Sequence, residues 1–201
     1  LGCLSLPKSR PVTITPYVTV VASGSNPPEG FENGRAGWFI EDLVTPDDST
    51  FVSWNHGSPT GSTINTSING SKVWWTSKNS ATYFPSEKSA VNSPCFNLDT
   101  LKRPMISLDY FSDIENNLDG VVMQYSIDGG KLWQLVGPLA GAINRDEGIN
   151  WFNGQSIPSS PGNQLIGQYG WTGKQGSWKN ARFNLDMVDK LERDQVRLRL
   201  A

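Results

Sequence analysis

Carboxylates are the side chains in this sequence best suited to chemistry, because the 201-residue chain has one histidine and two cysteines. Asp109, Asp113 and Glu115 alternate along or just beyond one predicted strand. Two carboxylates roughly 5 to 10 Å apart are enough for glycoside hydrolysis. His56 would have to serve alone in a metal site or a triad, and no HExxH, GxSxG or CxxC pattern occurs. We therefore expect no catalytic activity.

Aromatic side chains form a second group, because the C–H faces of sugar rings stack on Trp and Tyr. Two long connections rich in Gly and Asn, at 57–70 and 137–176, hold or flank several of the 8 Trp. Such connections are often functional. The candidate ligand-binding residues are Trp74, Trp75, Trp151, Tyr169, Trp171 and Trp178, with Trp151 and Trp171 favoured. Each is also a candidate core residue, since most Trp side chains in all-β domains anchor the core.

Short strands must position these side chains. Apolar and polar residues alternate most regularly in 119–127 and 195–200, which predicts two half-buried strands. In the second strand we expect Val196, Leu198 and Leu200 to face the core, with Arg197 and Arg199 facing solvent. Further strands are predicted at 17–22, 37–41, 51–55, 71–76, 104–112, 132–136 and 177–185, and one short helical stretch at 186–193. This order predicts an all-β antiparallel sandwich.

Composition and charge restrict the class of protein. The chain has 20 Gly, 13 Pro and a net charge of −2 with 18% charged residues, without the basic stripe that binds phosphates. No apolar run approaches the roughly 18 to 20 residues that cross a bilayer. We expect no nucleic-acid partner, no transmembrane segment, and a secreted or cell-surface location. Cys3 and Cys95 allow one disulfide or two thiols.

The predicted domain covers 16–201, because 1–15 holds two prolines and little periodicity and fits a linker or the end of a preceding module. The domain opens with Gly30-Phe31-Glu32-Asn33-Gly34 followed by Gly37-Trp38. This string resembles the opening of MAM-like jelly-roll modules, which include the cleaved-adhesin domains of bacterial surface proteases and several carbohydrate-binding modules.

Later segments strengthen the resemblance, which covers about residues 30–201. The segments at 93–98, 106–111 and 119–133, with Gly170-Trp171-Thr172-Gly173 and Val196-Arg197-Leu198-Arg199, are similar to secreted surface modules of Bacteroidetes-type bacteria. Ser126-Ile127-Asp128-Gly129-Gly130-Lys131-Leu132-Trp133 resembles the Asp-box hairpin of reelin repeats, with Leu132 in place of the usual Thr. We expect this hairpin to be a folding device, in which Asp128 accepts backbone N–H bonds, the glycines take positive φ and Trp133 anchors the core.

The resemblance implies a fold and a metal. The expected fold is an antiparallel jelly-roll β-sandwich of the concanavalin A or MAM-like type. In such modules the Glu equivalent to Glu32 is a structural calcium ligand, and hard oxygen ligands suit Ca²⁺. The candidate metal ligands are Glu32, Asp42, Asp48, Asp109 and Asp113. Family members also continue past the last strand, so the module is expected to lack its closing strand, which residues beyond Ala201 or a partner would supply.

These observations predict a non-catalytic extracellular binding or adhesion module of a larger protein, glycan-binding and calcium-stabilised, with a glycan or a secreted or cell-surface protein as its partner. The alternative is an accessory domain that supports a neighbouring peptidase or glycosidase in the same polypeptide.

Overall fold

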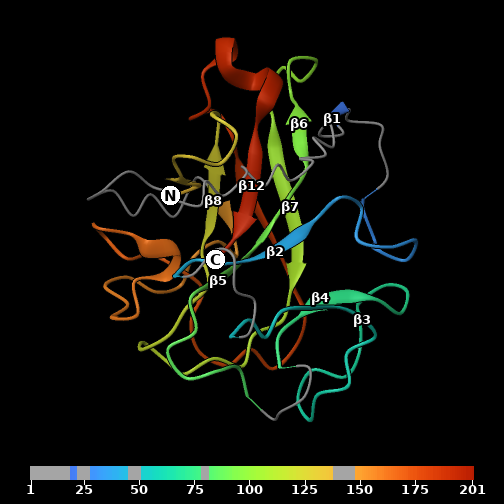
Figure 1. Ribbon diagram of the computed structural model, residues 1–201, viewed down its shortest axis with the longest axis vertical. Coiled ribbons are helices and arrows are strands. Elements are labelled where there is room, and N and C mark those ends of the chain that lie inside the picture. The colour runs from blue at the N-terminus through green and yellow to red at the C-terminus, as the bar shows by residue number, and fades with distance from the viewer. Residues whose placement is uncertain (1–18, 22–27, 45–50, 78–81, 138–147) are drawn as a thin grey trace, which may run out of the picture.

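The computed structural model describes residues 19–21, 28–44, 51–77, 82–137 and 148–201 (Figure 1). The predicted linker 1–15, with Cys3, and the candidate ligand Asp48 lie outside these residues. Within them, no helix is long and apolar enough to span a bilayer. Nearly all regular structure is β, and the main sheets are antiparallel, so the prediction of an all-β sandwich is confirmed. The jelly-roll strand order stays a prediction.

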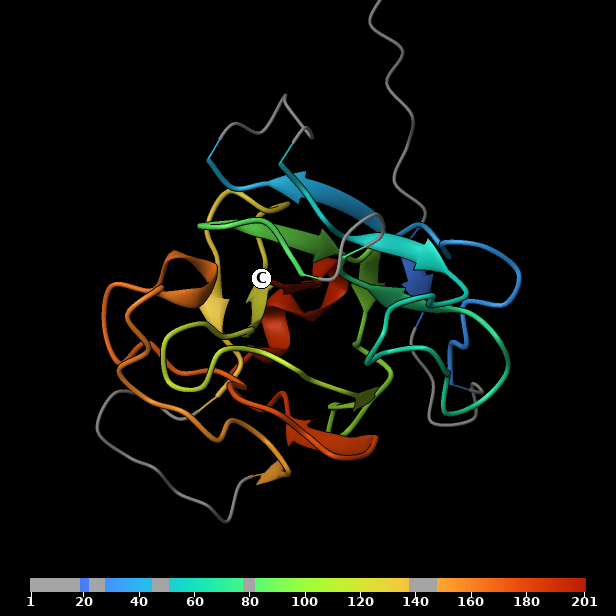
Figure 2. The same cartoon turned by 90° about the horizontal axis from the view of Figure 1, so that it is seen from below.

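The larger sheet has five antiparallel strands. Their order is β2 (Phe39–Asp42), β5 (Ser89–Asn92), β12 (Arg197–Leu200), β8 (Met123–Ser126) and β9 (Gln134–Leu135). The two most regular predicted strands are therefore confirmed, and they pair with each other through β12 and β8. In Figure 2 the strands of this sheet lie above those of the second sheet.

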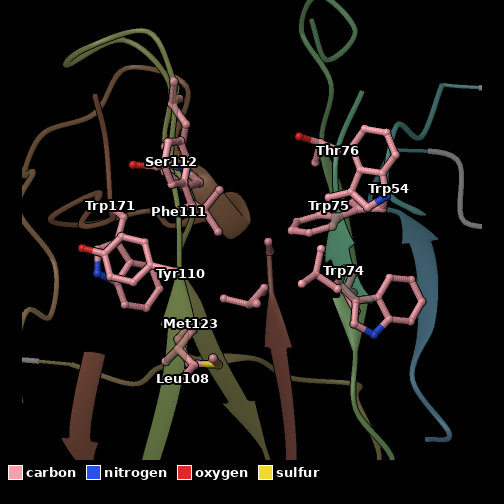
Figure 3. A pocket seen from close by; sticks show the side chains of 18 of the residues that line it. Trp54, Trp74, Trp75, Thr76, Leu108, Tyr110, Phe111, Ser112, Met123 and Trp171 are labelled. Atoms are coloured by element: carbon pink, nitrogen blue, oxygen red, sulfur yellow. The ribbon is translucent and has the colours of Figure 1, made fainter. Parts of the chain in front are cut away.

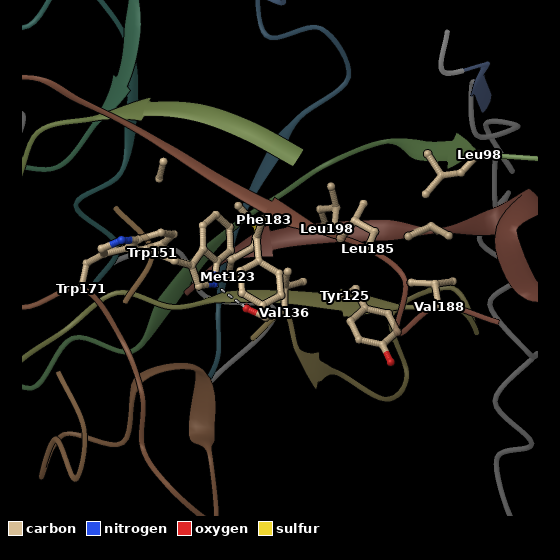
Figure 4. Close-up of a cluster of buried hydrophobic side chains, with 12 residues drawn as sticks. Leu98, Met123, Tyr125, Val136, Trp151, Trp171, Phe183, Leu185, Val188 and Leu198 are labelled. Carbon is tan, nitrogen blue, oxygen red and sulfur yellow. Dashed lines mark hydrogen bonds between the residues drawn. The ribbon is translucent and has the colours of Figure 1, made fainter. Parts of the chain in front are cut away.

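The second sheet has three strands, in the order β10 (Gly148–Ile149), β11 (Lys179–Asn184) and β7 (Met105–Tyr110). The core lies between the sheets, where Met123 and Leu198 of the larger sheet meet Phe183 of β11 (Figure 4). Residues alternate between the faces of a strand. Apolar side chains at every second position of β7 and β11 therefore build one wall of the core.

Two smaller pairs complete the described strands. β1 (Thr19–Val21) pairs in parallel with β6 (Cys95–Asn97), and β3 (Asn55–Gly57) forms an antiparallel pair with β4 (Val73–Trp75). Strand β3 begins where the predicted strand 51–55 was expected to end, so that prediction is wrong by most of its length.

Two further predictions differ from the structure. The predicted helical stretch 186–193 is a 3₁₀ turn at Lys190–Gln195, which begins after Asp189, whose Oδ1 accepts the Leu191 N–H at 2.9 Å. The connection 137–176 is not a plain loop in its described part. It contains β10 and a 3₁₀ turn at Pro161–Asn163.

Arg197 and Arg199 are buried, with exposed fractions of 4% and 6%, so the prediction that they face solvent is wrong. They alternate correctly along β12, but this central strand is covered on both faces. Arg199 Nε donates to Gln124 Oε1 at 2.8 Å, and its guanidinium lies over the Trp133 ring. Burial lowers the pKa of Arg199 to about 10, while the charge of Glu41 acts in the opposite direction. A buried charge is tolerated because these groups compensate for lost hydration.

Candidate binding cleft

A large cleft opens between β7 and the β3–β4 pair. Its volume is about 1530 Å³, and all six residues of β7 line it. Consecutive residues of a strand point to opposite faces, so a cavity that touches every one of them must lie against the strand's edge. The cleft therefore follows the open edge of the three-stranded sheet (Figure 3).

The floor of the cleft is apolar. Val91, Met123, Leu198 and Leu200 contribute to it from β5, β8 and β12, which are strands of the larger sheet. Val91 and Met123 are almost fully buried, whereas Leu200 is half-buried. Leu198 is also buried, so Leu200 presents most of the accessible apolar surface among these four residues.

The walls are aromatic. Phe111, which follows β7, and Trp75 of β4 project toward the space between the two strands from opposite sides (Figure 3). Trp54 lies beside β4 on the far wall. Phe111 packs edge-on against Trp178 with 6.0 Å between ring centroids, which positions it at the cleft.

Trp74 points to the opposite side of β4 from Trp75 (Figure 3). Its ring lies 5.4 Å from that of His56 and 6.4 Å from that of Phe31, measured between centroids, and Arg35 lies over its face. His56 Nε2 is 2.9 Å from the Phe31 carbonyl oxygen. The single histidine thus has a packing role in this cluster.

One contact joins two chain segments at the cleft rim. The Tyr83 hydroxyl donates to Asp119 Oδ2 at 2.7 Å and so links the connection before β5 to the connection before β8. Burial, together with this hydrogen bond to a carboxylate, raises the pKa of Tyr83 to about 12. Tyr83 therefore stays protonated, and the contact persists, across the whole neutral range.

Charged side chains at the cleft are mostly acidic. Carboxylates outnumber cations there, with Glu29, Glu87, Asp109, Asp113, Glu115 and Asp119 against Lys72, Lys88 and Arg182. Asp113 is paired with Lys174 at 3.1 Å, and this contact lowers the pKa of Asp113. The rim around the apolar floor thus has a negative potential.

The aromatic residues predicted to bind a ligand separate into two groups. Four of them line the cleft: Trp74 and Trp178 are half-buried there, whereas Trp75 and Trp171 are buried, with exposed fractions of 6% and 2%. Trp151 and Tyr169 lie in the buried interior, with exposed fractions of 9% and 4%. Trp151 Nε1 donates to the Val136 carbonyl at 2.8 Å, and its ring packs on those of Trp171 and Phe183. A sugar ring has no access to Trp151, and Trp171 is no more exposed, so both favoured residues of the long connection lie in the core cluster.

Four of the five carboxylates predicted to bind calcium lie in the described part of the chain, and each has its own donor. Glu32 accepts N–H bonds from Ser71 and Lys72 at 2.9 and 2.7 Å. Asp42 accepts the Val44 N–H, Asp109 accepts from Asn180, and Asp113 pairs with Lys174. In the described part of the chain, no group of three or more His, Cys, Asp or Glu side chains could hold a metal ion. These residues do not fit a shared calcium site, and calcium stays a sequence-based prediction.

The Asp-box-like hairpin has the expected local geometry. Asp128 Oδ1 accepts the N–H groups of Lys131 and Leu132, each at 3.0 Å, which lowers the pKa of Asp128. Gly129 and Gly130 have φ of 81° and 97°. Trp133 differs from the expectation: it is half-buried beneath Arg199, on the sheet face opposite the core.

Sequence reasoning missed Trp54 and Phe111, two of the aromatic residues that define the cleft. Phe111 comes directly after β7, in which apolar residues occupy every second position. The adjacent aromatic pair Tyr110-Phe111 ends this alternation and is visible in the sequence.

Cys95 is a buried free thiol whose sulfur accepts from Arg197 Nε at 3.4 Å.

Comparison of the chain with protein-family models, with curated proteins and with solved structures gives no match.

Proposed function

We propose that this protein is a non-catalytic extracellular binding module whose ligand occupies the cleft between β7 and the β3–β4 pair. The cleft itself carries the proposal. Its volume of about 1530 Å³ exceeds the roughly 300 to 1,000 Å³ of sites for small molecules. This size favours a segment of a polymer over a metabolite, since apolar and aromatic lining is common to both kinds of site.

Three of the four described groups named as suited to chemistry have partners within the protein, which supports a non-catalytic role; Glu115 is the fourth. His56 is held by the Phe31 carbonyl, Asp109 by Asn180 and Asp113 by Lys174. A general acid or base needs a pKa tuned toward neutrality, whereas Lys174 shifts the pKa of Asp113 downward.

Parallel binding screens test this function. The protein is applied to a glycan array and to a peptide array, as wild type, Trp54→Ala and Leu165→Ala. Trp54 lines the cleft, whereas Leu165 is 93% exposed and outside it. We expect binding to one ligand class, at least tenfold weaker for Trp54→Ala and unchanged for Leu165→Ala.

Failure to bind either class overturns the proposal. Binding that is unchanged in a Trp54→Ala variant with the wild-type melting temperature also overturns it. The accessory-domain alternative would then be preferred. Its own test is deletion of the module from the larger protein, with loss of yield but not of target binding.

A further inference from the structure

Within the described residues, the open edge of β7 presents backbone groups without a strand partner to the cleft. In an antiparallel pair, alternate residues exchange both hydrogen bonds with the partner, and the residues between them point both groups the other way. The Leu185 N–H donates to the Pro104 carbonyl at 2.8 Å, which marks that pair as a bonded one. By the register of β7 with β11, the backbone groups of Met105, Ser107 and Asp109 therefore point away from β11.

A second contact confirms this alternation. The Asn150 side-chain amide donates to the Asn180 carbonyl oxygen at 2.9 Å from the β10 side of β11. Asn180 pairs with Asp109, so the carbonyl of Asn180 points away from β7. Both partners of that pair consequently direct their backbone groups outward, and those of Asp109 point toward the cleft. In the described part of the chain, no strand pairs with this edge of β7.

The edge has little of the usual protection against strand pairing, since Asp109 is the one charged residue of β7. Sheet edges are normally short, bulged, or guarded by Lys or Pro. Strand β7, with six residues, is one of the two longest described strands, and its sequence MISLDY contains neither Lys nor Pro. A strand of six residues offers about 20 Å of edge at roughly 3.3 Å per residue.

The surroundings specify the side chains of an added strand. One face would lie on the apolar side of the cleft, where Leu200 of the larger sheet and Phe111 beside β7 are half-buried, which favours apolar residues at alternate positions. The other face would lie beside the mostly acidic rim, where Arg182 of β11 pairs with Ser107 and Asp109 is the charged residue of β7. Lys or Arg at the intervening positions would complement that charge.

We propose that the cleft binds an extended polypeptide segment of another protein, which adds as a strand to β7 through the backbone of Met105, Ser107 and Asp109. This assignment rests on the proposed function and names its ligand class. Backbone pairing supplies affinity, and alternate side chains on the apolar floor supply specificity.

Substitution of Ser107 by proline isolates the backbone contribution. Ser107→Pro removes the N–H that faces the cleft, and proline is tolerated at an edge where that N–H is not needed within the sheet. Ser107→Ala is the matched control, because both variants lose the side-chain contact with Asn180. The probe is a fluorescently labelled octapeptide of alternating Val and Lys, with alternating Val and Glu for comparison.

We expect the Val/Lys peptide to bind wild type and Ser107→Ala equally, and Ser107→Pro at least tenfold more weakly. The Val/Glu peptide should bind wild type more weakly, with the difference reduced at high salt. Hydrogen exchange on the wild type gives a readout that needs no variant. Bound peptide should slow the exchange of the Met105, Ser107 and Asp109 amides, whereas the amides that already pair with β11 should change little.

Undiminished peptide binding by a folded Ser107→Pro, or unchanged exchange of the three amides in the peptide complex, overturns strand addition. Absence of peptide binding, together with glycan binding that Trp54→Ala weakens, overturns strand addition but leaves the proposed function standing. Failure of both ligand classes overturns both.

Discussion

The guanidinium carbon of Arg199 lies 4.3 Å from the centroid of the Trp133 ring, on the face of the larger sheet opposite the core. Trp133 belongs to the Asp-box-like hairpin and Arg199 to the central strand, so this contact attaches the hairpin to the sheet.

Replacement of Arg199 should destabilise the protein. Arg199→Met removes the cation from the Trp133 face and the donor from Gln124 Oε1, at a cost of about 2 to 4 kcal/mol. Arg199→Lys keeps the charge but lacks the planar group that stacks and donates together, so its loss should be smaller. Urea denaturation measures both, and a Met variant as stable as wild type would contradict this role.

Gly70 should not tolerate a side chain. A Cβ there would lie 2.5 Å from Glu32 Oε1, and Gly70 has φ of +72°. Gly70→Ala should therefore cost about 1 to 3 kcal/mol. Gly176→Ala is the control, because nothing lies within 4 Å of its Cβ position, and it should change the free energy of unfolding by less than about 0.5 kcal/mol. Equal effects of the two substitutions would refute the steric explanation.

Glu32 should make stability depend on acidity. Backbone N–H bonds from Lys72 and Ser71 lower the pKa of Glu32 below its ordinary value of 4.5. A carboxyl with a depressed native pKa stabilises the fold above its unfolded pKa, and that stabilisation disappears as pH falls through the native pKa. Stability should therefore fall in acid below about pH 4.5, and less steeply for Glu32→Gln. The free energy of unfolding is measured by urea denaturation at each pH. If it falls equally steeply with acid in wild type and in Glu32→Gln, Glu32 does not cause the acid dependence.

Asp128 should protect two amides from exchange. Its Oδ1 accepts the N–H groups of Lys131 and Leu132. Asp128→Ala should accelerate hydrogen exchange at both amides, whereas Asp128→Asn keeps an oxygen that can accept and should preserve part of the protection. Unchanged exchange in the Ala variant would exclude this role.

Chelation should leave the melting temperature unchanged at fixed pH and salt. An ion bound only to the native state raises the apparent stability of that state. The four described candidates, Glu32, Asp42, Asp109 and Asp113, have separate partners, so they form no shared site from which EDTA could remove an ion. A drop in the melting temperature on addition of EDTA, reversed by calcium, would restore the sequence-based prediction of a calcium site.

The sequence by itself determined the class of fold and its most regular strands. Alternation with period two depends only on the geometry of one strand, so it identified the stretches that contain β8, β12, β7 and β11. The Asp128 turn was equally predictable, because its hydrogen bonds join residues at most four positions apart.

Tertiary structure decided which side chains are covered and where the cleft lies. Arg197 and Arg199 alternate as outward residues, yet β12 is the central strand of five and is buried on both faces. Trp151 looked suited to a ligand because it lies in a Gly-rich connection, but that connection packs into the core. The cleft forms where the edge of β7 meets Trp75 across the inner face of the other sheet. No local pattern encodes that meeting, because it depends on how two sheets of unequal width are packed.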